Sequence, residues 1–388
     1  MKVLVYCQHV LGVGHFFRTL EICRALAGHD IVLVSGGPRT PAALPSHVRR
    51  RQLPELIMDA RFQSLRSPSG ASLERVRTAR RRRLYRIVAE EAPDIFLVEL
   101  YPIGRRAFRF ELDPLLAAMA AGELPACKVV CSVRDILVEK KKAAAYDSRA
   151  VRVLNQRFDA LLVHADPRVV RLEETFGPLA DVKIPVVYTG YVASREAPLV
   201  DVAAWRQSRG VGPGDRLVLA SAGSGAVGFD LLHAVTRAMQ RLQADERVIL
   251  QAFTGPFMPP DQATVLAKRA GPDLRLARFS GEFGAWLQAA DASVSMAGYN
   301  TCMNILATGA KALVYPFGHN REQGMRARRL AARGILGVLD TPDLAPDRLA
   351  ARLRAVFEWQ PAPADIALDG AARTAAWLEN LVRPGGEA

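Results

Sequence analysis

The sequence has few cysteines and no long apolar run. Its 388 residues include five scattered cysteines, without a Cys-x-x-Cys pair or a cluster of His and Cys. This usage excludes a disulfide framework and a regularly spaced zinc site, and it indicates a reducing compartment. The apolar runs stay below the roughly 18 to 20 residues that a membrane-spanning helix needs, and the start of the chain has no signal-peptide pattern. We therefore expect a cytoplasmic protein.

Three common nucleotide-binding motifs are also missing. Gly12 and Gly14 follow the first strand-like run, but position 17 is Phe and the next run ends in Ser35, so the dinucleotide-binding fingerprint is incomplete. The chain has neither the Gly-Lys-Ser/Thr of a Walker A loop nor an Asp-x-Asp motif. We expect no metal ion and no other cofactor. The charge of a leaving phosphate must then be met by backbone dipoles and side chains.

Basic residues outnumber acidic ones by 52 to 39, which gives a net charge of +13. This balance favours an anionic partner such as a phosphorylated metabolite or a membrane surface, and we expect no nucleic-acid partner. One cluster holds Arg75, Arg77, Arg80, Arg81, Arg82, Arg83 and Arg86. We interpret it as a solvated helix face. The alternative is a surface patch in which Leu73, Leu84 and Tyr85 help to seat the protein on an acidic bilayer or a polyanionic acceptor.

Short apolar runs alternate with helical patterns along the chain. The runs lie at 2–7, 31–35, 94–99, 128–133, 160–164, 184–188, 216–220, 247–253, 274–279, 291–295 and 311–315. Strands that are apolar throughout, with helices between them, indicate parallel sheets covered on both faces. The stretch 193–214 has little strand pattern and ends in Gly and Pro, which is typical of a junction between domains.

These patterns predict two doubly wound, Rossmann-like α/β domains that face a central cleft. The N-terminal, acceptor-side domain covers 1–195, and the C-terminal domain covers 196–363. Residues 364–388 contain an amphipathic helix, which we expect to pack back toward the N-terminal domain. Ligands of such sheets bind outside the carboxyl ends of the strands. Residues that follow strands are therefore the candidates for function.

The residues that follow strands differ between the two halves of the chain. Titratable residues, among them His15, Glu99 and Asp135, follow the strands of the first half. In the second half, Gly223-Ser224-Gly225 and the turn 298–301 each precede a predicted helix. Two helix N-termini directed at one place suit a diphosphate, because their free N–H groups and partial positive charge favour anions.

Residues 290–334 contain a series of short motifs, namely Ala290-Asp291, Ser295–Gly298, Gly309–Lys311, Pro316–His319 and Glu322-Gln323. This series resembles the C-terminal domain of GT-B glycosyltransferases of the family 28-like group, which includes the peptidoglycan lipid-intermediate GlcNAc transferase. The family pattern is an Ala-Asp strand, a Ser-x-x-Gly turn, a helix, Gly-x-Pro, a strand ending in Pro-Phe, a His and a pair of Gln-like residues. The segment 12–15 is similar to the family's Gly-Gly-His loop, and 279–283 corresponds to its uracil-contacting loop.

The resemblance implies a GT-B fold and a nucleotide-sugar donor, with a UDP-sugar favoured, held mainly by the C-terminal domain. Ser280 and Phe283 would border the base, and Asn304 stands where the family has a ribose-binding Glu. Glu322 and Gln323 would bind the sugar hydroxyls. The residues implied for the diphosphate are Gly14, Gly223, Ser224, Gly225, Gly298, Tyr299, Asn300 and Thr301.

The predicted reaction is an inverting, metal-independent transfer of a hexosyl group to an acceptor hydroxyl. Neutral His15 would take the proton of the attacking hydroxyl as the donor's bond at C1 breaks. If His15 only binds phosphate, Glu99 or Asp135 would be the base. A lipid-linked, a soluble and a protein acceptor are all compatible with the sequence. The alternatives are a nucleotide-sugar 2-epimerase on the same fold and a non-catalytic binder of sugar nucleotides or glycans.

Three further polar residues receive structural interpretations. Arg18, one turn into the first helix, is either a phosphate contact or a surface residue, and we favour the surface position; we expect His164 to be structural. His319 is expected either to face the site or to order its own loop.

Overall fold

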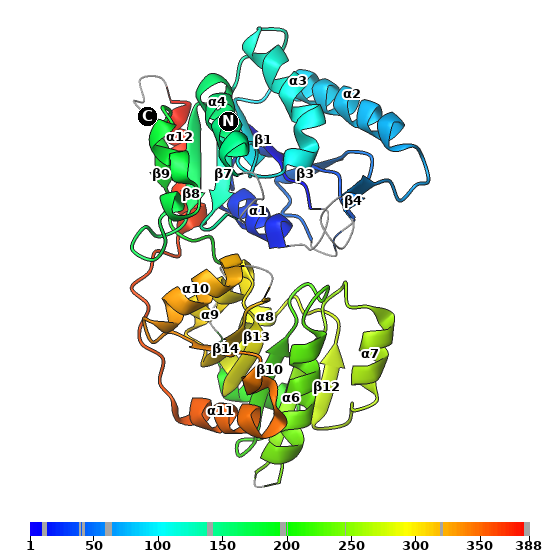
Figure 1. Cartoon of the computed structure of the whole chain (residues 1–388), viewed down its shortest axis with the longest axis vertical. Helices are drawn as coiled ribbons and strands as arrows, with labels where there is room; N and C mark the ends of the chain where they lie inside the picture. The colour runs from blue at the N-terminus through cyan, green and yellow to red at the C-terminus, as the bar shows by residue number, and fades with distance from the viewer. Residues whose placement is uncertain are drawn as a thin grey trace. The chain divides into compact units, whose positions relative to one another are not determined.

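The structure, a computed structural model, describes residues 1–9, 14–38, 40, 43–58, 64–137, 143–194, 199, 201–244, 246–318 and 321–383. Three residues of the predicted motifs, Gly12, Val13 and His319, lie outside the described residues. The chain divides into two compact units, which are described separately (Figure 1). Unit 1 comprises Met1–Val192 and Asp369–Ala388, and unit 2 comprises Ala193–Leu368.

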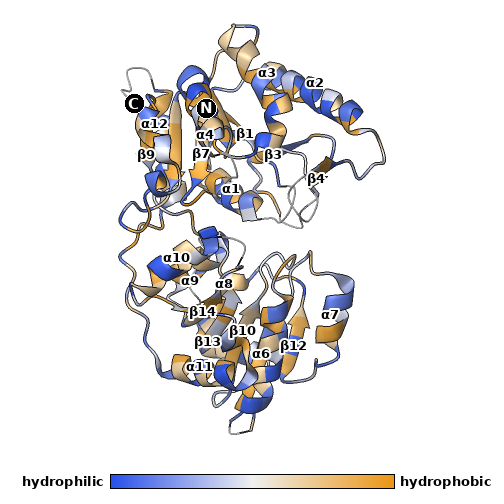
Figure 2. Cartoon of the chain, in the orientation of Figure 1, coloured by the Kyte–Doolittle hydropathy of each residue, from blue (hydrophilic) through white to orange (hydrophobic). Residues whose placement is uncertain are grey.

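Unit 1 is built on a parallel sheet of seven strands in the order β3-β2-β1-β6-β7-β8-β9. The strands are β1 (Lys2–Tyr6), β2 (Asp30–Ser35), β3 (Val48–Gln52), β6 (Ile95–Glu99), β7 (Lys128–Arg134), β8 (Ala160–His164) and β9 (Val186–Tyr188). Most are short runs of Val, Leu and Ile that are buried on both faces, as expected where helices cover a sheet on both sides. Figure 2 shows these strands as predominantly hydrophobic.

The helices of unit 1 cover this sheet, and the last helix of the chain is one of them. They are α1 (Gly14–Ala25), α2 (Leu73–Glu91), α3 (Arg109–Ala120), α4 (Ala143–Arg157) and α12 (Gly370–Leu381), with short 3-10 turns at Arg106–Phe108, Leu172–Glu174 and Gly177–Asp181. A two-stranded antiparallel ribbon joins β4 (Ile57–Met58) to β5 (Leu65–Arg66). Helix α12 packs against α1 and contributes Ala371, Ala375 and Leu378 to the core of unit 1. The chain therefore returns to its first unit after completing the second.

Arg80, one of the seven clustered arginines, is fully buried rather than exposed. Its Nε and Nη2 donate to the Glu111 carboxylate of α3 at 2.8 and 2.7 Å, and Nη2 also donates to Gln8 Oε1 at 2.9 Å. Tyr6 donates its hydroxyl proton to the same carboxylate. The expectation of a surface role was wrong for Arg80, because position 80 of α2 faces the core, where buried Glu111 pairs with its charge.

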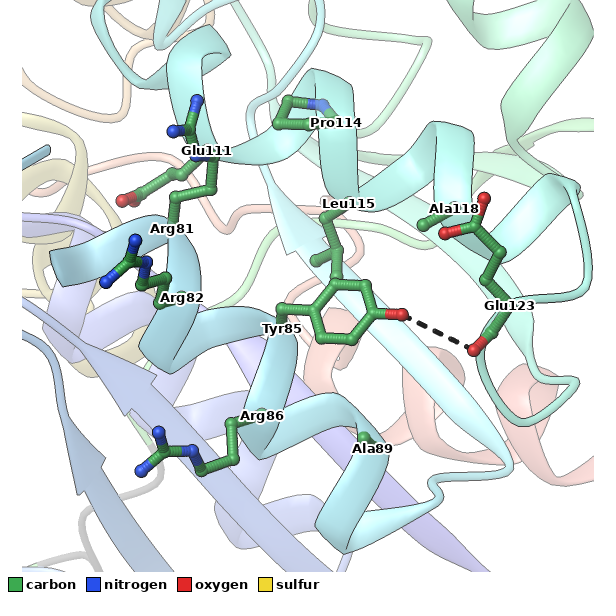
Figure 3. Close-up of a pocket in the computed structure, with 10 residues that line it drawn as sticks. All are labelled: Arg81, Arg82, Tyr85, Arg86, Ala89, Glu111, Pro114, Leu115, Ala118 and Glu123. Atoms are coloured by element: carbon green, nitrogen blue, oxygen red, sulfur yellow. Dashed lines mark hydrogen bonds between the residues drawn. The ribbon is translucent and has the colours of Figure 1, made fainter. Parts of the chain in front are cut away.

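Three arginines of the cluster, Arg81, Arg82 and Arg86, border a groove between α2 and α3. Leu84 is fully buried, so it is not part of any exposed patch, which corrects the second expectation for this helix. Figure 3 shows the Arg81, Arg82 and Arg86 side chains on the α2 side of the groove. The groove measures about 620 Å³, and its apolar lining includes Ala89, Pro114, Leu115 and Ala118. None of the residues expected to be catalytic or donor-binding is among the described residues that line it.

Unit 2 has a parallel six-stranded sheet in the order β12-β11-β10-β13-β14-β15. The strands are β10 (Arg216–Ser221), β11 (Val248–Phe253), β12 (Leu274–Ala277), β13 (Ala292–Met296), β14 (Ala312–Tyr315) and β15 (Gly337–Val338). The helices are α5 (Val202–Ser208), α6 (Phe229–Leu242), α7 (Pro260–Ala267), α8 (Phe283–Ala289), α9 (Tyr299–Thr308), α10 (Arg321–Ala331) and α11 (Pro346–Glu358), with a 3-10 turn at Pro342–Leu344.

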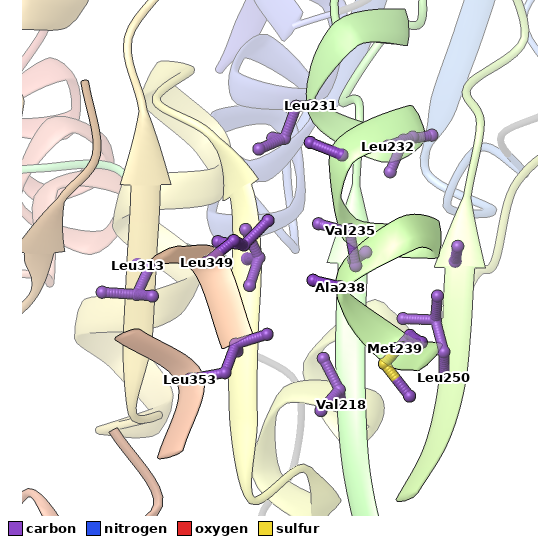
Figure 4. Close-up of a cluster of buried hydrophobic side chains, with 14 of the residues drawn as sticks. Val218, Leu231, Leu232, Val235, Ala238, Met239, Leu250, Leu313, Leu349 and Leu353 are labelled. Atoms are coloured by element: carbon purple, nitrogen blue, oxygen red, sulfur yellow. The ribbon is translucent and has the colours of Figure 1, made fainter. Parts of the chain in front are cut away.

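The core of unit 2 lies between its sheet and the helices α6 and α11. Leu231, Val235 and Met239 follow one another at spacings of four along α6, which places them on one face of the helix. Leu349 and Leu353 repeat this spacing on α11. Figure 4 shows both helices directing these side chains toward the strands. This burial fixes the first turn of α6 over the sheet edge, where a donor-binding loop was expected.

Candidate functional site

In both units, strand order reverses at the first strand. In unit 1, β1 lies between β2 and β6, and in unit 2, β10 lies between β11 and β13. In doubly wound sheets ligands bind outside the carboxyl ends of the strands at such a reversal. Each unit therefore has one candidate half-site, formed by the segments that follow these strands.

The half-site of unit 1 centres on a hydrogen bond between His15 and Glu99. His15 lies in the first turn of α1, which follows β1, and Glu99 is the last residue of β6. His15 Nδ1 lies 2.6 Å from Glu99 Oε1, and Arg18 Nη2 donates to the same oxygen at 2.5 Å. The structure thus brings together two predicted site residues that are 84 positions apart in the sequence.

Arg18, for which a surface position was favoured, lies beside this pair instead. Its side chain is only 2% exposed and is paired with Glu99, so the surface interpretation was wrong. The sequence did contain one signal for this position. Residues three apart on a helix share a face, and Arg18 follows His15 by three, so both side chains were expected on the same face of the helix. The sequence could not show that Glu99, on a distant strand, would lie opposite that face.

The surroundings of His15 keep its imidazole neutral near pH 7. Burial lowers the pKa of His15 to about 4; Glu99 opposes this change, and the guanidinium groups of Arg105 and Arg134 reinforce it. Burial alone would raise the pKa of Glu99, but His15, Arg18 and Arg105 together hold it below its usual range. An ionised Glu99 can only accept hydrogen bonds, so His15 carries its proton on Nδ1 and keeps the lone pair of Nε2 available.

Asp135 and His164 lie on the same sheet edge, but both are buried. Asp135 directly follows β7 and is fully buried, so its carboxylate has no exposed surface for a substrate. His164 ends β8, and its ring lies between the hydroxyls of Ser132, at 2.6 Å, and Thr189, at 2.8 Å. Burial lowers the pKa of His164 to about 3. These contacts agree with the structural interpretation of His164.

The half-site of unit 2 is made largely of backbone. Gly223 and Gly225 follow β10 with φ values of 63° and 88°, which glycine adopts without strain. A Cβ on Gly225 would overlap the carbonyl oxygen of Thr254, and one on Gly255 would overlap the backbone of Ser224. The loops after β10 and β11 therefore pack backbone against backbone, and Ser224 is held between glycines ahead of α6.

The turn before α9 lies at the neighbouring strand end. In the register of β10 with β13, Ser221 is paired with Ser295. Gly298 occupies the N-cap of α9, so the cap residue contributes no side-chain hydrogen bond to the helix N-terminus. Tyr299, the first helical residue, is buried with its ring against the Arg326 guanidinium. Asn300, Thr301 and Asn304 lie on the same helix and are half-buried.

Residues expected to bind the sugar make internal contacts at the start of α10. Glu322 is buried and accepts a hydrogen bond from Arg326 Nη2 at 2.6 Å, one turn along the helix. Gln323 Oε1 accepts from the Phe317 backbone N–H at 3.0 Å and thereby orders the segment after β14. These contacts fix both side chains at the carboxyl edge of the sheet.

The expected base-binding segment follows β12. Ser280 Oγ accepts a hydrogen bond from the backbone N–H of Glu282 at 3.0 Å. Phe283 begins α8, and its ring packs edge-on against Phe253 with a centroid distance of 6.0 Å. Phe279, just before this turn, is 45% exposed, which is unusual for a large aromatic side chain.

The described part of the chain contains no group of three or more His, Cys, Asp or Glu side chains arranged to hold a metal ion. No helix within the described ranges is long and apolar enough to cross a membrane.

Comparisons with known proteins match this architecture. Residues 223–372 match the glycosyltransferase family 28 C-terminal domain. The fold is similar to that of the kitacinnamycin glycotransferase (TM-score 0.62, 17% identity, 98% of this chain and 99% of that chain). It is also similar to SsfS6 of Streptomyces sp. SF2575 complexed with thymidine diphosphate (0.58, 16%, 98% and 99%) and to the spinosyn rhamnosyltransferase SpnG complexed with thymidine diphosphate (0.56, 16%, 98% and 95%). No curated protein matches the sequence.

The two parallel-sheet units and these neighbours define the GT-B fold. Within that class, residues 223–372 match the C-terminal domain of glycosyltransferase family 28, which identifies this part of the chain as a glycosyltransferase domain.

Proposed function

We propose that this glycosyltransferase moves a hexosyl group from a nucleotide diphosphate sugar to an acceptor hydroxyl, with inversion and without a metal ion. The observation that carries the proposal is the 2.6 Å contact between His15 and Glu99 at the strand reversal of unit 1. A neutral imidazole whose second nitrogen is fixed by a carboxylate is a suitable general base for an alcohol.

In this mechanism His15 Nε2 takes the proton of the acceptor hydroxyl as that oxygen attacks C1 of the donor. Attack from the side opposite the leaving diphosphate inverts the anomeric carbon. Glu99 holds the ring and stabilises the imidazolium that forms, as a carboxylate does in other base–carboxylate pairs. Glu99 is only 2% exposed and paired with Arg18, which suits this orienting role better than that of the base itself. The burial of Asp135 likewise favours His15 as the base.

The donor is assigned to unit 2. The loop of Gly223, Ser224 and Gly225, and the first turn of α9, would hold the diphosphate and stabilise its charge as it leaves. Ser280 and Phe283 would border the base, and Glu322 and Gln323 would bind the sugar hydroxyls. A UDP-sugar is the first candidate, on the resemblance to family 28-like enzymes. A thymidine diphosphate sugar is the second, because SsfS6 and SpnG, which share the fold, are complexed with thymidine diphosphate.

We also propose that the acceptor is presented at an anionic surface. Arg81, Arg82 and Arg86 are exposed along the groove between α2 and α3, where they suit the phosphates of an acidic bilayer carrying a lipid-linked acceptor. Flotation with vesicles containing an acidic phospholipid, at low and high salt, tests this part separately. We expect binding to the vesicles at low salt and loss of that binding at high salt. No binding at low salt would contradict the proposed contact with an anionic surface.

The donor assignment is tested with a panel of UDP- and TDP-sugars. We expect one family of donors to raise the melting temperature of the full chain and to be hydrolysed slowly in the absence of an acceptor. When candidate acceptors are added, we expect transfer of the sugar with inversion at its anomeric carbon. The NMR signal of the anomeric proton reports this configuration. If the donor sugar is epimerised in the absence of any acceptor, the protein is a nucleotide-sugar epimerase rather than a glycosyltransferase.

A further inference from the structure

The loop that follows β6 is held in an unusual backbone conformation. Leu100 and Arg105, neither of them glycine, have φ values of 67° and 52°, in the left-handed region that ordinary residues rarely adopt. The loop is anchored at several points: the Leu100 N–H donates to the Ser132 carbonyl at 2.8 Å, and Tyr101 and Ile103 are fully buried. Strain of this kind persists where the surroundings determine it, and it is concentrated at functional sites. The residue that this loop delivers to the half-site is Arg105.

The guanidinium of Arg105 lies beside the pair of His15 and Glu99 without completing a hydrogen bond. Its Nε is 3.5 Å from Glu99 Oε2, whereas Oε1 of the same carboxylate is bonded to His15 and to Arg18. The Arg105 side chain is 14% exposed, and its buried Nε has no hydrogen-bond partner among the residues that the structure describes. A buried donor without a hydrogen-bond partner carries a free-energy cost, which a ligand that improves the pairing of the guanidinium can offset.

Several positive charges gather around this loop. Arg18 and Arg105 share the Glu99 carboxylate, at 2.5 and 3.5 Å, and Arg105 and Arg134 both act on His15. His15 and His164, which lie on the same edge of the sheet, are neutral near pH 7. A site in which two guanidinium groups share one carboxylate favours an anionic ligand.

We propose that Arg105 binds an anionic group of the acceptor, a phosphate or a carboxylate, and so holds the nucleophilic hydroxyl beside His15. The geometry suits it, because guanidinium pairs with both anions through two parallel hydrogen bonds. We assign the anion to the acceptor rather than to the donor diphosphate because Arg105 belongs to unit 1, whereas the family 28 C-terminal domain lies at 223–372. The proposal rests on the proposed role of His15, and it names the chemical class of the acceptor.

An anion bound at Arg105 would also change the pKa of His15, the proposed base. Arg105 and Arg134 both lower the pKa of His15, so an anion bound between them would raise it from about 4 toward its ordinary value. His15 would then be a stronger base when the acceptor is bound than when the site is empty. The groups that face the imidazole in this comparison are Glu99, Arg105 and Arg134, with Arg18 behind the carboxylate.

The experiment follows the His15 ring by NMR while inorganic phosphate is added to the full chain. The His15 resonance is assigned by its loss in His15→Gln. We expect phosphate to raise the midpoint of the His15 titration in the native chain by about one pH unit or more, as when a neighbouring charge is cancelled. In Arg105→Gln the midpoint should already be higher without phosphate, and phosphate should leave it unchanged. Arg106→Gln is the matched control, because Arg106 is the next residue, is exposed and should respond like the native chain.

Two results would overturn the proposal. One is an Arg105→Gln variant, folded by circular dichroism, whose His15 still responds to phosphate like that of the native chain. The other is a loss of UDP or TDP affinity of tenfold or more in Arg105→Gln, which would assign Arg105 to the donor diphosphate. Arg105→Lys keeps the charge and should retain part of the response of His15 to phosphate. This variant replaces Arg105→Gln in the experiment if Arg105→Gln does not fold. The titration uses neither donor nor turnover, so its result is independent of whether sugar transfer is found.

Discussion

Units 1 and 2 have the same strand order at their centres but different chemistry at the reversal point. At the end of β6, unit 1 places a carboxylate against an imidazole and a guanidinium, whereas after β10 and β13 unit 2 places glycine, serine and the N-terminal turn of a helix. Charged side chains can move protons and bind charged substrates, while fixed backbone N–H groups suit a diphosphate. The topology provides two equivalent positions, and the residues at the strand ends decide what each can do.

The two half-sites are also held in place differently. In unit 1 the end of β1 is fixed by buried side chains, since Arg80 bonds Gln8 as well as Glu111. In unit 2 the loops after β10 and β11 are fixed by direct contact between the backbones of Gly225 and Gly255 and their neighbours. Substitutions should therefore act through charge in unit 1 and through volume in unit 2.

The largest expected effect is on stability, in Arg80→Met. Removing the guanidinium leaves Glu111 buried without its cation, which should lower the free energy of unfolding by about 3–5 kcal/mol. Urea denaturation followed by circular dichroism measures it. Arg81→Met, one residue along and exposed, should change the stability by less than about 0.5 kcal/mol. Equal losses in the two variants would contradict the buried-network account of unit 1.

The next effect concerns the carboxylate partner of His15. Glu99→Gln keeps the shape of the side chain but removes the charge that stabilises the imidazolium, so turnover of the donor should fall by about 10²-fold. The rate of donor hydrolysis at saturating donor checks this. Glu123→Gln, a substitution at an exposed position, should stay within about twofold of the native chain. A Glu99→Gln rate equal to that of this control would remove Glu99 from the mechanism.

In unit 2, Gly225→Ala should weaken donor binding by about tenfold. The new Cβ would overlap the Thr254 carbonyl and would sit on a backbone with φ of 88°, so the loop must shift by a distance that matters for hydrogen bonds to a diphosphate. Calorimetry with the selected donor measures the change. Gly214→Ala is the control, since a Cβ there meets nothing within 4 Å. Unchanged affinity in a folded Gly225→Ala variant would argue against this loop as the diphosphate site.

The smallest effect is in the pH profile. Because burial holds the pKa of His15 at about 4, donor hydrolysis should stay constant from pH 7.5 to about 5 and reach half its value near pH 4. An ordinary imidazole would lose half its activity near pH 6.5. Arg105→Gln should move the acid limb to higher pH, because Arg105 lowers the pKa of His15. An acid limb near pH 6.5 in the native chain would show that His15 is not in the environment described here.

The fold could be predicted well from the sequence, because parallel strands buried on both faces appear as continuous apolar runs. Strand β3 was not predicted, since its sequence, Val-Arg-Arg-Arg-Gln, has no apolar run. It forms at the sheet edge, where Arg49 and Arg51 pair with Glu91 of α2. Ion pairs between distant segments leave no periodic signal in the sequence.

The same limit applies to the site. Residues at strand ends were predicted because the sheet edge follows from the order of apolar runs. The pairing of His15 with Glu99 was not predicted, because it depends on β1 lying beside β6. The burial of Arg18 and Arg80 was not predicted either, since each is set by a carboxylate on another element. Which side chains form ion pairs depends on the packed structure rather than on the local sequence.

The division of work between the units is tested most directly by His15→Ala, with donor affinity and rate measured on the same preparation. The account predicts a donor dissociation constant within about twofold of the native value and a rate of turnover at saturating donor that is lower by about 10²- to 10⁴-fold. A large loss of donor affinity with a normal rate at saturation would contradict it, because His15 would then bind the donor rather than carry the proton.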